Sequence, residues 1–131
     1  WALVMLHPTT FCPDDAEQEL AEARVAVGDR QAIWLAPGND PGREWLYEQM
    51  MDSLEDIPDE LYPSLLRHLD VMIGNSSALI TDAPFVGVKT VEIGKRQEGR
   101  DRVPYGDGHS IPRIVNILQW IDFRPLLCEA S

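Results

Sequence analysis

The sequence predicts an α/β fold, a three-layer Rossmann-like domain with a mostly parallel sheet. Short apolar runs of strand length, such as 1–6 and 71–73, alternate with stretches of helical periodicity. Turns rich in glycine, proline, asparagine and aspartate separate them. The apolar runs are continuous, which is typical of strands covered by helices on both faces. The predicted order is β-α-β-α-α-β-α-β-(β)-α.

The first half of the chain predicts two strands and three helices. Each strand is a short apolar run, and each helix carries apolar residues at helical spacing along one side. The segment 37–42 is rich in turn residues, and both a plain turn and a functional loop stay open there. No convincing strand is found in 52–60. The predicted strands are 1–6 and 32–36, and the predicted helices are 12–26, 42–54 and 62–69.

The second half is organised around a strand–turn–helix–strand unit within residues 71–100. Gly74 ends its first strand, and the polar residues Asn75, Ser76 and Ser77 offer an N-cap to the helix. Pro84 is expected to limit that helix. The predicted strands are 71–73, 88–93 and a weak edge strand at 103–105, and the predicted helices are 78–83 and 111–127.

Two features of this unit favour binding of a phosphate or diphosphate. The turn directs backbone N–H groups and two hydroxyls to the start of a helix, where the dipole favours negative charge. The loop after the second strand carries Lys95, Arg96 and Arg100, and arginine suits bidentate contact with phosphate. Because parallel strands end at one edge of the sheet, turn and loop should lie together. The alternative is a strand-to-helix cap without a ligand.

His7 follows the first predicted strand directly. A side chain at the carboxyl end of a parallel strand lies where open α/β sheets bind their ligands. The alternative is a histidine that only hydrogen-bonds to neighbouring backbone. The position therefore makes His7 a candidate site residue beside the polar turn.

Composition limits the classes of function. The 131 residues are enough for one domain with a core, and the formal net charge of −11 argues against nucleic acid or an anionic membrane as partner. No apolar run approaches the roughly 20 residues of a transmembrane helix. Two free thiols at Cys12 and Cys128 fit a cytoplasmic protein, although a bridge stays open. No Cys/His set has metal-site spacing, so neither a metal nor a cofactor is expected.

Several of these motifs resemble the UDP-N-acetylglucosamine 2-epimerases, and most closely the hydrolysing branch. The resemblance includes His7-Pro8 and the turn-rich segment 37–42, and it matches only the carboxyl-terminal half of such an enzyme. Its most specific part is the ending Arg96-Gln97-x-Gly99-Arg100. The other matching positions are Ile73-Gly74-Asn75-Ser76-Ser77, Ala83-Pro84, Gly87 and Ile93-Gly94.

The resemblance implies a fold, a reaction and a set of residue roles. Residues 1–131 would form a single nucleotide-sugar-binding domain, like the carboxyl-terminal lobe of a GT-B pair, with the amino-terminal lobe absent. The whole enzyme would eliminate UDP from a UDP-sugar and add water, giving N-acetylmannosamine, whereas the isolated half would be inactive. His7 would be catalytic, contacting the diphosphate or acting as an acid/base, and Asp82 would bind the ribose. The substrate-binding set is Asn75, Ser76, Ser77, Asp82, Arg96 and Arg100.

Two other functions stay open. One is the donor-binding lobe of a GT-B glycosyltransferase, which shares the fold and the diphosphate chemistry. The other is a non-catalytic, stand-alone domain that binds a nucleotide or a partner protein. We also expect a homodimer through the helix at 111–127, whose Trp120 and Phe123 extend beyond the face that a sheet can cover. The alternative is that this helix closes the domain's own core.

Overall fold

The computed structural model of the protein describes residues 1–9, 15–50, 52–100 and 110–120. The predicted strand at 103–105, the part of the last helix beyond 120 and both cysteines lie outside these residues. The strands are β1 (Ala2–Met5), β2 (Ala32–Leu35), β3 (Val71–Gly74) and β4 (Lys89–Glu92). The helices are α1 (Ala16–Val27), α2 (Arg43–Gln49), α3 (Tyr62–Arg67), α4 (Ala78–Val86) and α5 (Ser110–Trp120). This order confirms the predicted α/β fold.

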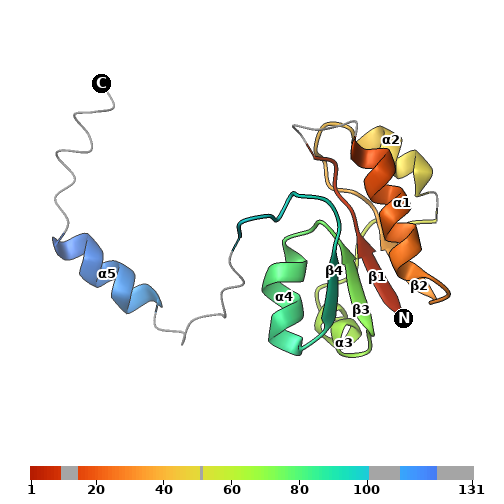
Figure 1. Ribbon diagram of the computed structural model, residues 1–131. Coiled ribbons are helices and arrows are strands. Elements are labelled where there is room, and N and C mark those ends of the chain that lie inside the picture. Colours follow the sequence, from red (N-terminus) through yellow and green to blue (C-terminus); the bar gives the residue numbers. More distant parts are fainter. Residues whose placement is uncertain (10–14, 51, 101–109, 121–131) are drawn as a thin grey trace, which may run out of the picture.

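The described strands form one all-parallel sheet in the order β2-β1-β3-β4 (Figure 1). The chain goes from β1 to β2 on one side and then returns to β3 on the other side of β1. Strand order therefore reverses between β1 and β3, which pair from Ala2 with Val71 to Met5 with Gly74. Ligands of open α/β sheets bind outside the carboxyl ends of the strands at such a switch point.

Helices cover both faces of the sheet and give the predicted three layers (Figure 1). Neighbouring residues of a strand point to opposite faces, so Val4 lies in one core and Leu3 in the other. The core under α1 and α2 contains Ala2, Val4, Leu6, Leu20, Ala23, Leu46, Met50, Val71 and Ile73. The core under α3 and α4 contains Leu3, Leu66, Leu69, Met72, Leu79 and Ala83.

The prediction that Pro84 limits the helix after the polar turn is wrong. Helix α4 continues through Pro84 to Val86 and ends at Gly87, whose φ is 77° and whose N–H donates to the Ala83 carbonyl. A proline removes one N–H donor from a helix interior and disfavours its continuation. Here the helix continues for only the residues 84–86, and packing of the partly buried Val86 against the core holds this end in place.

The helix predicted at 42–54 is also too long. Helix α2 ends at Gln49, and Leu54 instead forms an isolated parallel bridge with Leu35 of β2. The Leu54 N–H donates to the Trp34 carbonyl at 2.8 Å, and the Ala36 N–H donates to the Leu54 carbonyl at 2.8 Å. One residue of 52–60 therefore pairs with the edge of the sheet without forming a strand.

Helix α5 has an apolar stripe at helical spacing, Ile111, Ile114, Val115 and Leu118, and all four side chains are exposed. Figure 1 shows this helix apart from the sheet. The alternative reading, in which this helix closes the domain's own core, is therefore not met by these four residues. No helix in the described part of the chain has the length and apolar character needed to span a bilayer.

Candidate functional site

His7 lies just beyond the carboxyl end of β1, at the switch point of the sheet. Its Nδ1 accepts a hydrogen bond from the Gly38 N–H at 2.9 Å. A Cβ on Gly38 would lie only 3.1 Å from that nitrogen, so glycine allows the close approach. Burial, and then the nearby Arg96 charge, lower the pKa of His7 below its ordinary 6.5. His7 is therefore neutral at pH 7, with Nδ1 accepting and the proton on Nε2.

Asn75 holds the main chain of His7 in place. Its Oδ1 accepts from the His7 N–H at 2.8 Å, and its Nδ2 donates to the His7 carbonyl at 2.9 Å. The second hydrogen of Nδ2 goes to Glu19 Oε2 at 3.2 Å. Asn75 is 1% exposed, and both donor hydrogens of its amide are used within the protein.

Glu19 is a buried acid on the first turn of α1, with 7% of its surface exposed. Burial, and then the nearby Asp15, raise the pKa of Glu19 above its ordinary 4.5, while the hydrogen bond from Asn75 opposes this shift. The carboxyl also lies directly against Gly94, because a Cβ there would be 1.9 Å from Oε1. Gly94 has a φ of 65°, so two constraints favour glycine at this position.

The raised pKa predicts that Glu19→Gln is more stable than the parent chain at pH 7. The unfolded chain loses this proton near pH 4.5, and the folded chain loses it at higher pH. Stability therefore falls as pH rises through that window, and the penalty persists above it. Urea denaturation should show the gain at pH 7 and its disappearance near pH 4. Glu17→Gln, on an exposed position of α1, is the control, and an equal effect of both changes would contradict the prediction.

The polar turn after β3 leads directly into α4. Ser76 is buried, and its Oγ accepts from the Ala78 N–H at 3.3 Å within the turn that leads to the N-cap, Ser77. Ser77 is exposed and makes no side-chain capping bond. The backbone N–H groups of Ser76 and Ser77 have no acceptor among the described residues. The turn thus places two backbone donors at the positive end of a helix dipole.

The loop after β4 is tied to the other two loops of the switch point. Arg96 donates to the Pro8 carbonyl at 3.2 Å and to Asp40 Oδ2 at 3.2 Å, and so joins the loops after β1 and β2. Gln97 is buried, and its Nε2 donates to the Asn75 carbonyl at 2.8 Å. Arg96 is therefore held beside His7, on the same edge of the sheet as the polar turn.

Two of the predicted site residues have other local partners. Asp82 lies on α4 toward α3, where the Tyr62 hydroxyl donates to it at 3.0 Å and the Thr81 hydroxyl at 2.7 Å. It borders a hollow of about 400 Å³ between the two helices, together with Tyr62 and Phe85. Arg100 is exposed, and its N–H donates to the Gln97 carbonyl at 3.2 Å. The structure thus gathers His7, Asn75, Ser76, Ser77 and Arg96 into one cluster.

Comparison with known proteins identifies the family. The family model described as UDP-N-acetylglucosamine 2-epimerase matches residues 1–103, which include every residue of the cluster. The chain belongs to the UDP-N-acetylglucosamine 2-epimerase family. It is 31% identical over 111 residues to the UDP-N-acetylglucosamine 2-epimerase of Neisseria meningitidis serogroup B (strain ATCC BAA-335 / MC58), an alignment that covers 76% of this chain and 29% of that protein.

A second relative of this epimerase-family chain is the polysialic acid biosynthesis protein P7 of Escherichia coli. The two are 26% identical over 147 residues, which cover 98% of this chain and 37% of that protein. The chain thus spans about a third of the length of these curated relatives. The family match confirms the resemblance that the motifs predicted.

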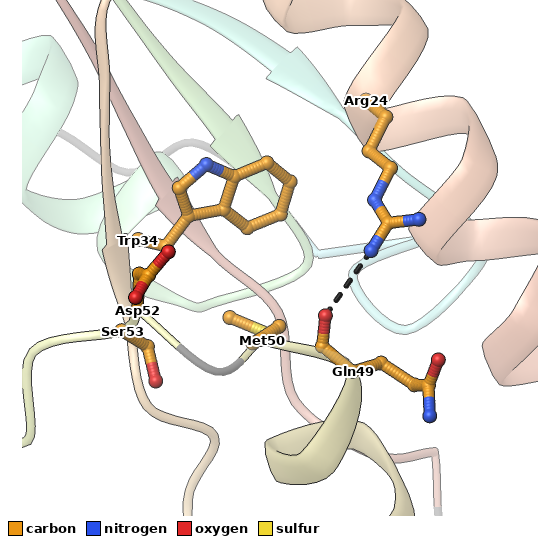
Figure 2. A pocket seen from close by; sticks show the side chains of 6 residues that line it. All are labelled: Arg24, Trp34, Gln49, Met50, Asp52 and Ser53. Carbon is orange, nitrogen blue, oxygen red and sulfur yellow. Dashed lines mark hydrogen bonds between the residues drawn. The ribbon is translucent and has the colours of Figure 1, made fainter.

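Figure 2 shows another hollow of the domain, of about 210 Å³. It is bordered by α1, β2 and the end of α2, and Arg24 donates across it to the Gln49 carbonyl at 3.1 Å. The other lining residues are Trp34, Met50, Asp52 and Ser53. It shares no residue with the cluster at the switch point.

Three residues that support the cluster were not identified individually from the sequence, although the segment 37–42, which contains Gly38 and Asp40, was left open as a functional loop. Glu19 reads as an acid on the solvent side of a helix, and Gly38 and Asp40 read as turn residues. Each reaches the cluster through a partner distant in the chain: 56 residues separate Glu19 from Asn75, and 31 separate His7 from Gly38. Gln97 belongs to the motif that carried the resemblance, and this was the signal available for it.

Proposed function

We propose that this chain is a UDP-N-acetylglucosamine 2-epimerase-like domain that binds the diphosphate of a UDP-sugar at the switch point. The observation that carries the proposal is the joining of three donor-bearing loops at one edge of the sheet. They contribute His7, the Ser76-Ser77 turn and Arg96, linked by the hydrogen bonds of Arg96, Asn75 and Gln97. Aimed N–H groups and a guanidinium are suited to a diphosphate.

Each group of the cluster has a distinct task in this proposal. The N–H groups of Ser76 and Ser77 and the guanidinium of Arg96 stabilise the charge that builds on the departing diphosphate. The neutral imidazole of His7 donates from Nε2 to the same anion or moves a proton. Asn75 has its amide committed to His7 and Glu19, so we assign it a positioning role in place of direct substrate contact.

The remaining predicted residues serve the rest of the nucleotide. Asp82 binds the ribose hydroxyls beside the hollow between α3 and α4, and Arg100 adds positive charge near the diphosphate. Residues 1–131 act as one nucleotide-sugar-binding domain of a cytoplasmic enzyme with a GT-B arrangement. A second lobe supplies the acids that act on the sugar. The complete reaction eliminates UDP and adds water to give N-acetylmannosamine, which the Arg96-Gln97-x-Gly99-Arg100 ending supports.

The 131-residue chain should bind UDP measurably and uridine much more weakly. Both ligands carry the same base and ribose, so the difference isolates the diphosphate that the cluster is proposed to hold. Isothermal titration calorimetry with millimolar ligand provides the comparison. Equal, negligible heats for UDP and uridine would refute the diphosphate site.

The chain should also self-associate as a two-fold dimer through α5. This helix has an exposed apolar stripe of Ile111, Ile114, Val115 and Leu118. Removing this stripe from water by packing it against a second copy is favourable. Sedimentation velocity over a hundredfold concentration range should show a growing dimer fraction. Ile114→Glu should reduce that fraction, whereas Val25→Glu, on exposed α1 surface, should leave it unchanged. A monomer at every concentration would contradict the dimer.

A further inference from the structure

We propose that Glu19 is a positioning residue for His7 and acts through the Asn75 amide. This inference rests on the proposed function, because it concerns how His7 is held at the proposed diphosphate site. The contacts themselves are independent of any ligand. Three elements meet in them: helix α1, the end of β1 and the turn after β3.

The first step is the way in which Asn75 extends the sheet. Strands β1 and β3 stop pairing at Met5 and Gly74, and the Asn75 N–H still donates to the Met5 carbonyl at 3.1 Å. Beyond this point the Asn75 side chain pairs both the N–H and the carbonyl of His7. An amide bonded in this way replaces one further rung of the ladder, and it fixes the backbone from which the His7 imidazole projects.

The second step is the attachment of this rung to helix α1. The Asn75 amide has one remaining hydrogen, and in this buried position it requires an acceptor. Glu19 Oε2 accepts this hydrogen at 3.2 Å. The Asn75 amide is therefore held by three hydrogen bonds, two with His7 and one with Glu19. Without that acceptor the amide gains an unpaired buried donor and can tilt away from His7.

Glu19 also contacts the loop after β4, which carries Arg96. The carboxyl occupies the space where a side chain at Gly94 would begin, since a Cβ there would be 1.9 Å from Oε1 and 2.7 Å from Cδ. Gly94 opens the loop that carries Arg96, and Gln97 of that loop donates to the Asn75 carbonyl. One carboxyl therefore contacts both the residue that holds His7 and the base of the loop that holds Arg96.

Two substitutions, Glu19→Gln and Glu19→Met, separate a positioning role of Glu19 from a role in packing. Gln and Met have nearly the same length and volume, but only Gln offers an oxygen acceptor to the Asn75 amide. Glu17→Met, on an exposed position of the same helix, controls for the loss of a negative charge and for the change in helix propensity. The three variants and the parent chain are compared in the absence of ligand and then with UDP.

The first readout is the imidazole of His7 in long-range ¹⁵N–¹H NMR spectra, which report tautomer and pKa. We expect Glu19→Gln and Glu17→Met to keep a single Nε2–H tautomer with a depressed pKa. Glu19→Met should show mixed tautomers, a His7 pKa closer to 6.5, and UDP affinity lower by about tenfold. A folded Glu19→Met protein with an unchanged His7 spectrum would overturn the positioning role.

The readouts distinguish the two proposals. If the parent chain does not bind UDP, the proposed function fails, while the ligand-free His7 spectra still decide the role of Glu19. If Glu19→Met does not fold, the parent chain provides the second test. The Asn75 side-chain protons should then exchange slowly with solvent and show a nuclear Overhauser effect to the Glu19 side chain. Fast exchange without that effect would overturn the inference.

Discussion

Replacing Gly74 with alanine should destabilise the domain by more than about 4 kcal/mol, a large share of the roughly 5–15 kcal/mol by which single domains are stable. Gly74 ends β3 with a φ of 143°, which residues with a Cβ rarely adopt. An added Cβ would lie 2.0 Å from the Met5 carbonyl oxygen and 2.6 Å from its carbon. Both atoms are backbone of the central strand, so relief requires β1 and β3 to separate.

Gly87→Ala provides the matched control. Gly87 also has a positive φ, 77°, but a Cβ there would meet nothing within 4 Å. Its substitution should therefore cost only the conformational penalty, about 1 kcal/mol. Chemical denaturation followed by circular dichroism compares the two variants with the parent chain. Similar midpoints for Gly74→Ala and Gly87→Ala would mean that the close approach of β1 and β3 is wrong.

Replacing Arg96 with methionine should weaken UDP binding by about thirtyfold, the equivalent of about 2 kcal/mol for a lost hydrogen bond to a charged group. The change removes the guanidinium and also releases Pro8 and Asp40 from the loop. Arg96→Lys should give an intermediate loss, because lysine keeps the charge but cannot donate in two directions from a planar fork. Uridine binding should be unchanged in both variants.

Arg24→Met is the control for a lost arginine. Arg24 also donates to a backbone carbonyl, that of Gln49, but it lies beside the hollow in Figure 2, which shares no residue with the proposed site. Calorimetry should therefore give the same UDP affinity for Arg24→Met as for the parent chain. An Arg96→Met protein that binds UDP as tightly as Arg24→Met would exclude Arg96 from the site.

The sequence predicted the architecture well because parallel strands covered on both faces leave a strong signal. The runs at 1–6 and 32–36 contain β1 and β2, and the run at 71–73 covers β3 except for its last residue, Gly74. Element ends were predicted less well because packing decides them. Helix α4 continues past Pro84 to Val86, which packs against the core, and Leu54 leaves the helical pattern to pair with Leu35. A local sequence pattern does not contain these long-range contacts.

The candidate site was predictable where its residues lie close to the end of a strand. His7, Asn75 and Ser76 follow β1 or β3 directly, so topology alone places them at the switch point. The supporting residues were not predictable in this way. A glutamate in a helix is typical of a solvent-facing position. Only the fold shows that the Glu19 carboxyl lies against Gly94 and beside Asn75. The sequence also did not show that the Asn75 amide, predicted to bind substrate, pairs with the N–H and the carbonyl of His7.

Titration of the ¹⁵N-labelled chain with UDP, followed by ¹⁵N–¹H correlation NMR, tests the diphosphate site most directly. We predict that the largest shifts fall on the backbone N–H groups of Ser76, Ser77 and Ala78 and on the Arg96 side chain. Uridine at the same concentration should leave those signals nearly unchanged. Absence of shifts at these groups, or shifts confined to the hollow around Trp34 and Arg24, would contradict the diphosphate site.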